Sequence, residues 1–113
     1  SRTAWVHLPA QPDGAPVILA FHGHGGTAGH AARRFALEAL WPEAIVVYPQ
    51  GLPSRTPNDP EGRRAGWSLL PTAGNRDLKW VDAILETART EWKADPRRVF
   101  SMGHSNGAAF TYL

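Results

Sequence analysis

The chain has 113 residues, of which 42% are hydrophobic and 19% charged, and its formal net charge is +2. This composition is typical of a folded domain with a core, and it excludes a disordered chain. The lack of cysteine excludes disulfides, thiolate metal sites and a cysteine nucleophile, and the lack of a Lys/Arg run argues against a nucleic-acid partner.

The chain alternates predicted strands and helices. Residues 3–8, TAWVHL, alternate weakly, which is typical of an edge or antiparallel strand. Residues 16–23 and 44–51 are short apolar runs that end in glycine, and they indicate parallel strands buried on both faces. Residues 95–102, DPRRVFSM, turn and re-enter as a further strand.

Two helices are predicted between these strands. The first begins after Thr27, which caps it, and ends at Pro42. The second runs from Asp77 to Trp92, and its apolar stripe leaves Asp77 and Asp82 as expected solvated positions. The stripe consists of Leu78, Val81, Leu85, Ala88 and Trp92. The order predicts an α/β fold in one domain, with flanking helices on a mostly parallel sheet.

Residues 51–76 form a long segment with no clear period, rich in Gly, Pro, Asn and Arg. Such segments are often functional, and this one follows a strand at the edge where open α/β sheets bind ligands. Trp67 is therefore a candidate wall of a substrate pocket, and packing within the loop is the alternative. Three arginines could meet an anionic substrate or lie in solvent: Arg55, Arg63 and Arg64.

A Gly-x-Ser-x-Gly motif spans residues 103–107, between a predicted strand and a predicted helix. This context is typical of a nucleophile elbow, in which glycines such as Gly103 and Gly107 relieve steric crowding. The turn places the backbone N–H of Asn106 at a helix start, where it can stabilise an oxyanion. Ser105 is thus the candidate nucleophile, and an inert serine in a Gly-rich turn is the alternative.

Residues 21–28, FHGHGGTA, end the second predicted strand. In hydrolases with such an elbow, the loop after this strand supplies the other oxyanion donor. The backbone N–H of His24 is the candidate, with that of Gly25 next. We expect His22 to be a structural hydrogen-bonding residue.

The same loop allows two other interpretations. His22 and His24 could hold a metal with a third histidine, but no carboxylate lies at a suitable spacing. Residues 23–26 could cradle a phosphate, as in a phosphate-binding α/β domain, but neither Gly-x-Gly-x-x-Gly nor a Gly-Lys-Ser/Thr ending is present. We therefore predict no metal and no cofactor.

These segments occur in an order that resembles α/β-hydrolases of the polyhydroxybutyrate depolymerase and feruloyl esterase type. The most specific run is Asp95-Pro96-x-Arg98-Val99-Phe100-x-x-Gly103-x-Ser105-Asn106-Gly107. The resemblance covers essentially the whole chain but only the N-terminal part of such an enzyme. It implies a serine esterase that forms an acyl-enzyme on Ser105, with the N–H groups of His24 and Asn106 as its oxyanion hole. Ala108 departs from the family, in which a second glycine is common.

A serine esterase also needs an acid and a histidine, which follow the serine in α/β-hydrolases. After Ser105 the sequence contains no Asp, Glu or His, and we expect His104 to have a packing or rim role. We therefore expect residues 1–113 to be a partial α/β-hydrolase domain, truncated after the elbow and inactive alone. The alternative is a non-catalytic binding module that keeps the elbow without a triad base.

The expected partner is an ester substrate, which could be a polyester, an aryl ester or a small ester. No membrane partner is expected, because the longest apolar runs fall far short of the ~20 residues that a span needs. The family resemblance favours a secreted or periplasmic location.

Overall fold

The computed structural model describes residues 2–69 and 74–113. Its middle layer is a four-stranded sheet in the order β1–β3–β2–β6. These strands are β1 (Ala4–His7), β2 (Val17–Phe21), β3 (Ile45–Pro49) and β6 (Val99–Gly103). β2 is parallel to both β3 and β6, whereas β1 is antiparallel to β3 at the edge. The predicted antiparallel edge strand and parallel sheet are confirmed.

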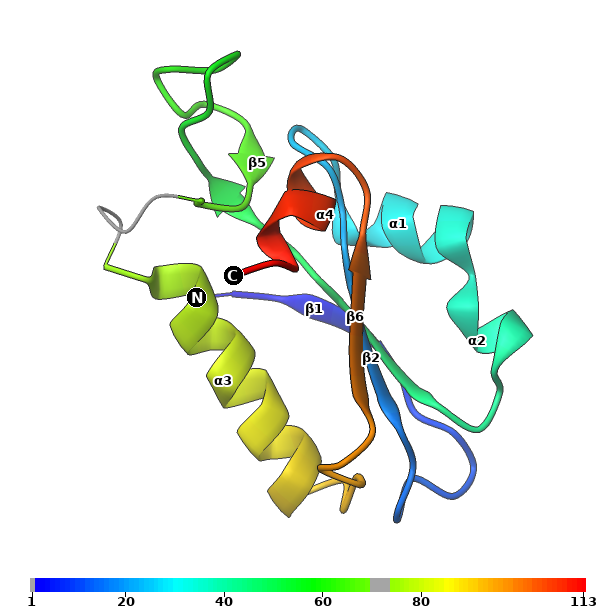
Figure 1. Ribbon diagram of the computed structural model, residues 1–113. Coiled ribbons are helices and arrows are strands. Elements are labelled where there is room, and N and C mark those ends of the chain that lie inside the picture. The colour runs from blue at the N-terminus through cyan, green and yellow to red at the C-terminus, as the bar shows by residue number, and fades with distance from the viewer. Residues whose placement is uncertain (1, 70–73) are drawn as a thin grey trace.

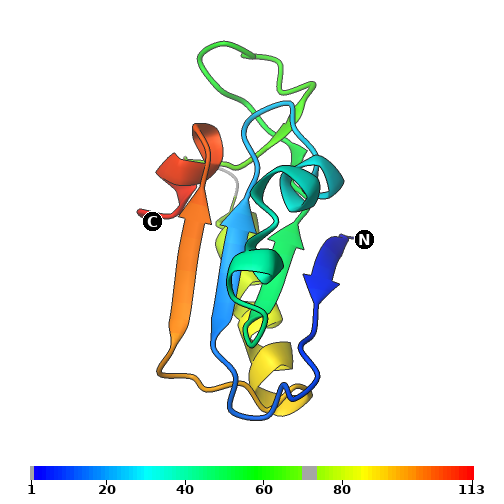
Figure 2. The ribbon, with the colours of Figure 1, turned by 90° about the vertical axis from the view of Figure 1, so that its right-hand side faces the viewer.

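Helices cover both faces of this sheet (Figure 1). One face carries α3 (Arg76–Thr90), and the other carries α1 (Ala28–Phe35) and α2 (Leu37–Leu40). The short α4 (Asn106–Phe110) directly follows β6. Figure 2 views the sheet from the α1 side, where β2, β3 and β6 all point their carboxyl ends to one edge. Among the described residues, no helix has the length and apolar character needed to cross a membrane.

The sheet separates two apolar clusters, and this explains the continuous apolar runs of its central strands. β3 is buried along its whole length because both of its faces are covered. The cluster on the α3 side includes Leu19, Phe21, Val47, Trp67 and Ile84. The cluster on the α1 side includes Ala20, Ala31, Val46 and Tyr48.

The single helix predicted between β2 and β3 is in fact two helices. Thr27 caps α1 as predicted, since its side chain accepts a hydrogen bond from the His30 N–H at 3.1 Å. Ala36 then adopts a left-handed conformation (φ 45°, ψ 46°), which ends α1. Buried Tyr48 stabilises the break, because its hydroxyl accepts from the Leu37 N–H at 3.0 Å and donates to Glu38 at 2.6 Å. Burial, together with the hydrogen bond to Glu38, raises the pKa of Tyr48.

Residues 50–75 are here called the β3–α3 loop. The loop contains a two-stranded antiparallel ribbon of β4 (Leu52–Pro53) and β5 (Ala65–Gly66). The part of it that contains β4 and β5 rises beyond the carboxyl edge of the sheet (Figure 1). The rest of its described part is irregular, as expected from the absence of any sequence period.

Asp77 anchors the end of this loop, and the prediction that it is solvated is wrong. Its side chain is only 2% exposed. The carboxylate accepts a hydrogen bond from the Ser68 N–H at 2.8 Å and pairs with the Arg2 guanidinium at 2.7 Å. Asp82 is exposed, as predicted.

Replacing Asp77 by alanine should remove a buried acceptor and leave the Arg2 charge without its partner. We expect the free energy of unfolding to fall by about 3 kcal/mol, measured by urea denaturation. Asp82→Ala, on the exposed face of the same helix, should change it by less than about 0.5 kcal/mol. Equal effects of the two changes would contradict the anchoring role of Asp77.

Candidate active site

Three connections meet at the carboxyl edge of the sheet. They are the β2–α1 loop (residues 22–27), the β3–α3 loop, and the β6–α4 turn (residues 104–105). They come together because β2, β3 and β6 are parallel and end at the same edge (Figure 2). This edge is where open α/β sheets place their ligands.

The β6–α4 turn holds Ser105 in a conformation that is rare for a residue with a side chain. Its φ is 54° and its ψ is −113°, and such strain is typical of functional sites. A Cβ at Gly103 would lie 2.5 Å from the Gly107 carbonyl oxygen, and one at Gly107 would lie 2.5 Å from that of His22. These contacts support the steric role predicted for both glycines. The side chain of Ser105 is exposed.

Several backbone N–H groups near this turn donate no hydrogen bond within the described residues, and two of them matter for the predicted oxyanion hole. These two belong to His24 and Asn106, the two predicted oxyanion donors. The Gly25 N–H, in contrast, donates to the Ala65 carbonyl at 2.6 Å. The structure therefore leaves His24 as the candidate in the β2–α1 loop and does not support Gly25.

His22 is a structural residue, as predicted. Its side chain is buried, and its Nδ1–H donates to the Gly23 carbonyl at 2.7 Å. Its Nε2 accepts from the Gly51 N–H at 2.9 Å, which fixes the neutral tautomer. Burial lowers the pKa of His22, so the ring stays neutral and joins the β2–α1 loop to the β3–α3 loop.

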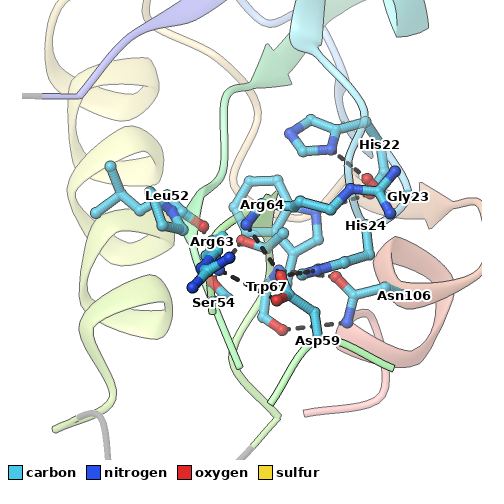
Figure 3. Close-up of polar contacts among 12 residues, drawn as sticks. His22, Gly23, His24, Leu52, Ser54, Asp59, Arg63, Arg64, Trp67 and Asn106 are labelled. Carbon is cyan, nitrogen blue, oxygen red and sulfur yellow. Dashed lines mark hydrogen bonds and ion pairs between the residues drawn. The ribbon is translucent and has the colours of Figure 1, made fainter. Parts of the chain in front are cut away.

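The His24 side chain is held by Asp59, a residue that no sequence pattern singled out. The His24 Nε2–H donates to the Asp59 carboxylate at 2.9 Å (Figure 3). Asp59 also accepts hydrogen bonds from the N–H groups of Arg63, at 3.2 Å, and Arg64, at 2.9 Å. The hydrogen bond from His24 is the main cause that lowers the pKa of Asp59 to about 2. An ionised Asp59 therefore fixes the residue whose backbone N–H is the candidate donor.

The side chain of Asn106 is also held by the β3–α3 loop, through the backbone of Trp67. Its side-chain oxygen accepts from the Trp67 N–H at 2.7 Å, and its amide donates to the Trp67 carbonyl at 3.1 Å. The Trp67 indole N–H in turn donates to the His22 carbonyl at 2.9 Å. Trp67 is 0% exposed, so it is a packing residue and not a wall of a substrate pocket.

A pocket of about 480 Å³ opens between the β6–α4 turn and α1. We call it the α1 pocket. Its lining comprises residues 22–27, His30, Ala31, Arg34, Phe35 and His104. His104 is exposed and adjacent to Ser105, so its rim position agrees with the packing or rim role expected for it.

The described residues supply no base for Ser105. Within residues 2–69 and 74–113, no histidine or carboxylate is hydrogen-bonded to its hydroxyl. The same ranges contain no group of three or more His, Asp or Glu side chains that could hold a metal ion. The site thus combines an exposed serine with two unpartnered N–H donors.

No family model matches the chain. Over 98% of its length, the chain is 28% identical to the bifunctional acetylxylan esterase/xylanase XynS20E of Neocallimastix patriciarum. Over 88% of its length, it is 29% identical to NocK of Nocardia uniformis subsp. tsuyamanensis, a protein provisionally assigned as an esterase. The chain spans only 15% and 28% of the lengths of these two relatives.

Among solved structures, the fold is similar to that of YahD, which was solved with malic acid. The TM-score is 0.62 at 16% sequence identity, and the match covers 95% of this chain and 53% of YahD. This likeness shows the mixed α/β fold. Both sequence relatives are named as esterases, NocK provisionally. The narrower resemblance to polyhydroxybutyrate depolymerases and feruloyl esterases stays a prediction.

Gly107→Ala should disrupt the β6–α4 turn, because the new Cβ would overlap backbone oxygens at the end of β2. We expect a loss of about 2 kcal/mol in the free energy of unfolding. Ala109→Ser, on the exposed side of α4, should change it by less than about 0.5 kcal/mol. Urea denaturation of both variants measures this difference, and an unchanged Gly107→Ala protein would argue against the steric role.

Asp59→Ala should loosen the β2–α1 loop, because His24 loses its acceptor. Hydrogen exchange of the Gly25 amide should become faster, while that of Val47 in the buried β3 stays unchanged. Glu61→Ala removes an exposed carboxylate from the β3–α3 loop, in which Asp59 also lies, and should leave the exchange rate of the Gly25 amide unchanged. Equal exchange of Gly25 in all three proteins would rule out the anchoring role of Asp59.

The Asp59 anchor also has a defined dependence on pH. Its pKa is lowered from 3.8 to about 2 in the folded state. Its contribution to stability is therefore complete above its unfolded pKa and is lost as the pH falls through about 2. The difference in stability between the parent protein and Asp59→Ala should therefore shrink as the pH falls below 4.

Proposed function

We propose that this chain is the nucleophile-bearing part of a serine esterase, a partial α/β-hydrolase domain that cleaves carboxylic esters through an acyl-enzyme on Ser105. One observation carries the proposal. An exposed serine lies at a strained strand-to-helix turn, and two nearby N–H groups donate no hydrogen bond within the described residues: that of Asn106, which directly follows the serine, and that of His24 in the β2–α1 loop. Weak similarity to two esterases supports the same reaction class.

In this mechanism the Ser105 hydroxyl oxygen attacks the ester carbonyl carbon, and its proton passes to a base. The carbonyl π electrons move to the oxygen, and the N–H groups of His24 and Asn106 stabilise the resulting oxyanion. Collapse of this intermediate expels the alcohol, which takes the proton from the base. Water then attacks the acyl-enzyme in the same manner and releases the acid.

The base and its orienting acid lie outside the described residues in this proposal. Without a base, a serine hydroxyl is a weak nucleophile at neutral pH. Both curated relatives are much longer than this chain, which leaves room for a histidine and a carboxylate elsewhere in such proteins. The oxyanion donors alone would give only residual catalysis.

The β3–α3 loop has a positioning role in this mechanism. It holds the His24 side chain through Asp59 and the Asn106 side chain through the Trp67 backbone. Donors fixed before the reaction need no reorganisation when the oxyanion forms, which is the main source of their catalytic effect.

The proposed substrate is a carboxylic ester. XynS20E is named for acetylxylan, whereas the sequence resemblance indicates polyesters or feruloyl esters. These substrates share the ester carbonyl on which Ser105 would act. A non-catalytic binding module is the second candidate, and the lack of a base at Ser105 among the described residues favours it.

An activity-based fluorophosphonate probe decides between the two candidates. In the protein at its full natural length, we expect the probe to label Ser105 because an activated serine attacks phosphorus. Ser105→Ala should abolish labelling, and Ser101→Ala, an exposed serine on β6, should retain it. A folded protein that stays unlabelled would favour the binding module, and labelling that survives Ser105→Ala would remove Ser105 from its role.

A further inference from the structure

The lining of the α1 pocket contains basic side chains and no acidic ones. It includes the guanidinium of Arg34 and four histidine residues. Two carboxylates on neighbouring segments are already engaged. Asp59 accepts from His24, and Glu38 accepts from the Tyr48 hydroxyl. These hydrogen bonds do not remove the charge of either carboxylate, but neither residue belongs to the lining, so the described lining residues place no carboxylate beside the Arg34 guanidinium.

Arg34 also differs from most other arginines of the chain. Six arginines form ion pairs with carboxylates: Arg2, Arg63, Arg76, Arg89, Arg97 and Arg98. Within residues 2–69 and 74–113, the Arg34 guanidinium has neither an ion pair nor a hydrogen bond, and it lies at a pocket wall. Its five N–H donors are thus available to a ligand, and a guanidinium matches the two oxygens of a carboxylate.

A second unpaired guanidinium, that of Arg64, lies against the β2–α1 loop, which forms part of the lining of the α1 pocket. Arg64 lies against Gly25, where an added Cβ would be 2.9 Å from the Arg64 Cζ. Figure 3 shows the Arg64 side chain extending toward the β2–α1 loop. The candidate oxyanion loop is therefore flanked by positive charge from α1 and from the β3–α3 loop, which favours the approach of an anion.

We propose that the α1 pocket binds a carboxylate, and that the substrate is an ester carrying a second, free carboxylate group. The identification of an ester rests on the proposed function, whereas the carboxylate site stands on the pocket alone. The pocket extends from His104, next to Ser105, to Arg34 in the last turn of α1. One molecule can therefore present its carbonyl to Ser105 and its carboxylate to Arg34, which makes Arg34 a specificity-determining residue.

Binding is tested first, because it needs no catalysis. The protein at its full natural length is titrated with succinate and with neutral succinamide, and amide shifts are followed by NMR. We expect saturable shifts at Gly25 and Gly26 with succinate only. Arg34→Gln should abolish them, and Arg33→Gln, the adjacent exposed arginine outside the pocket lining, should retain them. Absence of saturable succinate binding, or equal binding by Arg34→Gln, would overturn the proposal.

Specificity is tested with two esters of similar length, mono-4-nitrophenyl succinate and neutral 4-nitrophenyl butanoate. Arg34→Gln should lower kcat/KM for the anionic ester about tenfold or more, since it removes a charge-assisted contact. It should leave the neutral ester unchanged, and Arg33→Gln should affect neither. An equal loss for both esters would overturn the specificity role. If neither ester is cleaved and Ser105 is unlabelled, the esterase proposal fails, and the titration still decides the carboxylate site.

Discussion

The buried indole of Trp67 is the contact on which the candidate site depends. Its ring packs edge-on against Phe21 at the end of β2, with centroids 5.0 Å apart, and stacks on Phe110 of α4 at 5.2 Å. Its N–H donates to the His22 carbonyl. One side chain thus joins the end of β2, the β3–α3 loop and α4. The candidate nucleophile and both candidate donors lie on or directly beside these segments, so their relative positions depend on how this indole packs.

Around that indole, the site keeps several polar groups in costly arrangements. The N–H groups of His24 and Asn106 have no partner in the described part of the chain, and Ser105 has a strained backbone. A free chain would relax such features, since unpaired N–H groups and positive φ angles both cost free energy. They persist because Asp59 and the Trp67 backbone hold the neighbouring side chains.

The sequence predicted the elements that depend on local pattern. The continuous apolar runs of β2 and β3, the stripe of α3 and the Thr27 cap are all encoded in short windows. It did not predict the break at Ala36, because Phe35, Ala36 and Ala39 keep a helical apolar spacing across it. The cause of the break is Tyr48, which lies on β3. Asp77 appeared solvated for the same reason, since its partners Arg2 and Ser68 are distant or outside the helix.

The residues of the candidate site also fall into two groups: those that a local sequence pattern selects and those that depend on contacts with distant residues. Gly103, Ser105 and Gly107 could be selected because their spacing reflects a local steric requirement. Asp59 could not, because an acidic residue in an irregular loop has no period or spacing that relates it to His24, 35 residues away. Trp67 was placed in the correct loop, but its burial depends on Phe21 and Phe110.

The β3–α3 loop and α1, which border the site on two sides, differ in how freely their sequences can change. The β3–α3 loop is fastened to the candidate catalytic backbone, so a change in its length would also move His24 or Asn106. α1 contributes side chains such as Arg34 to the pocket, and that guanidinium bonds to nothing in the described residues. Substitutions on α1 can therefore alter which molecules are accepted without moving the reacting groups. In a lineage that acquires new substrates, diversity should accumulate on α1 before it reaches the β3–α3 loop.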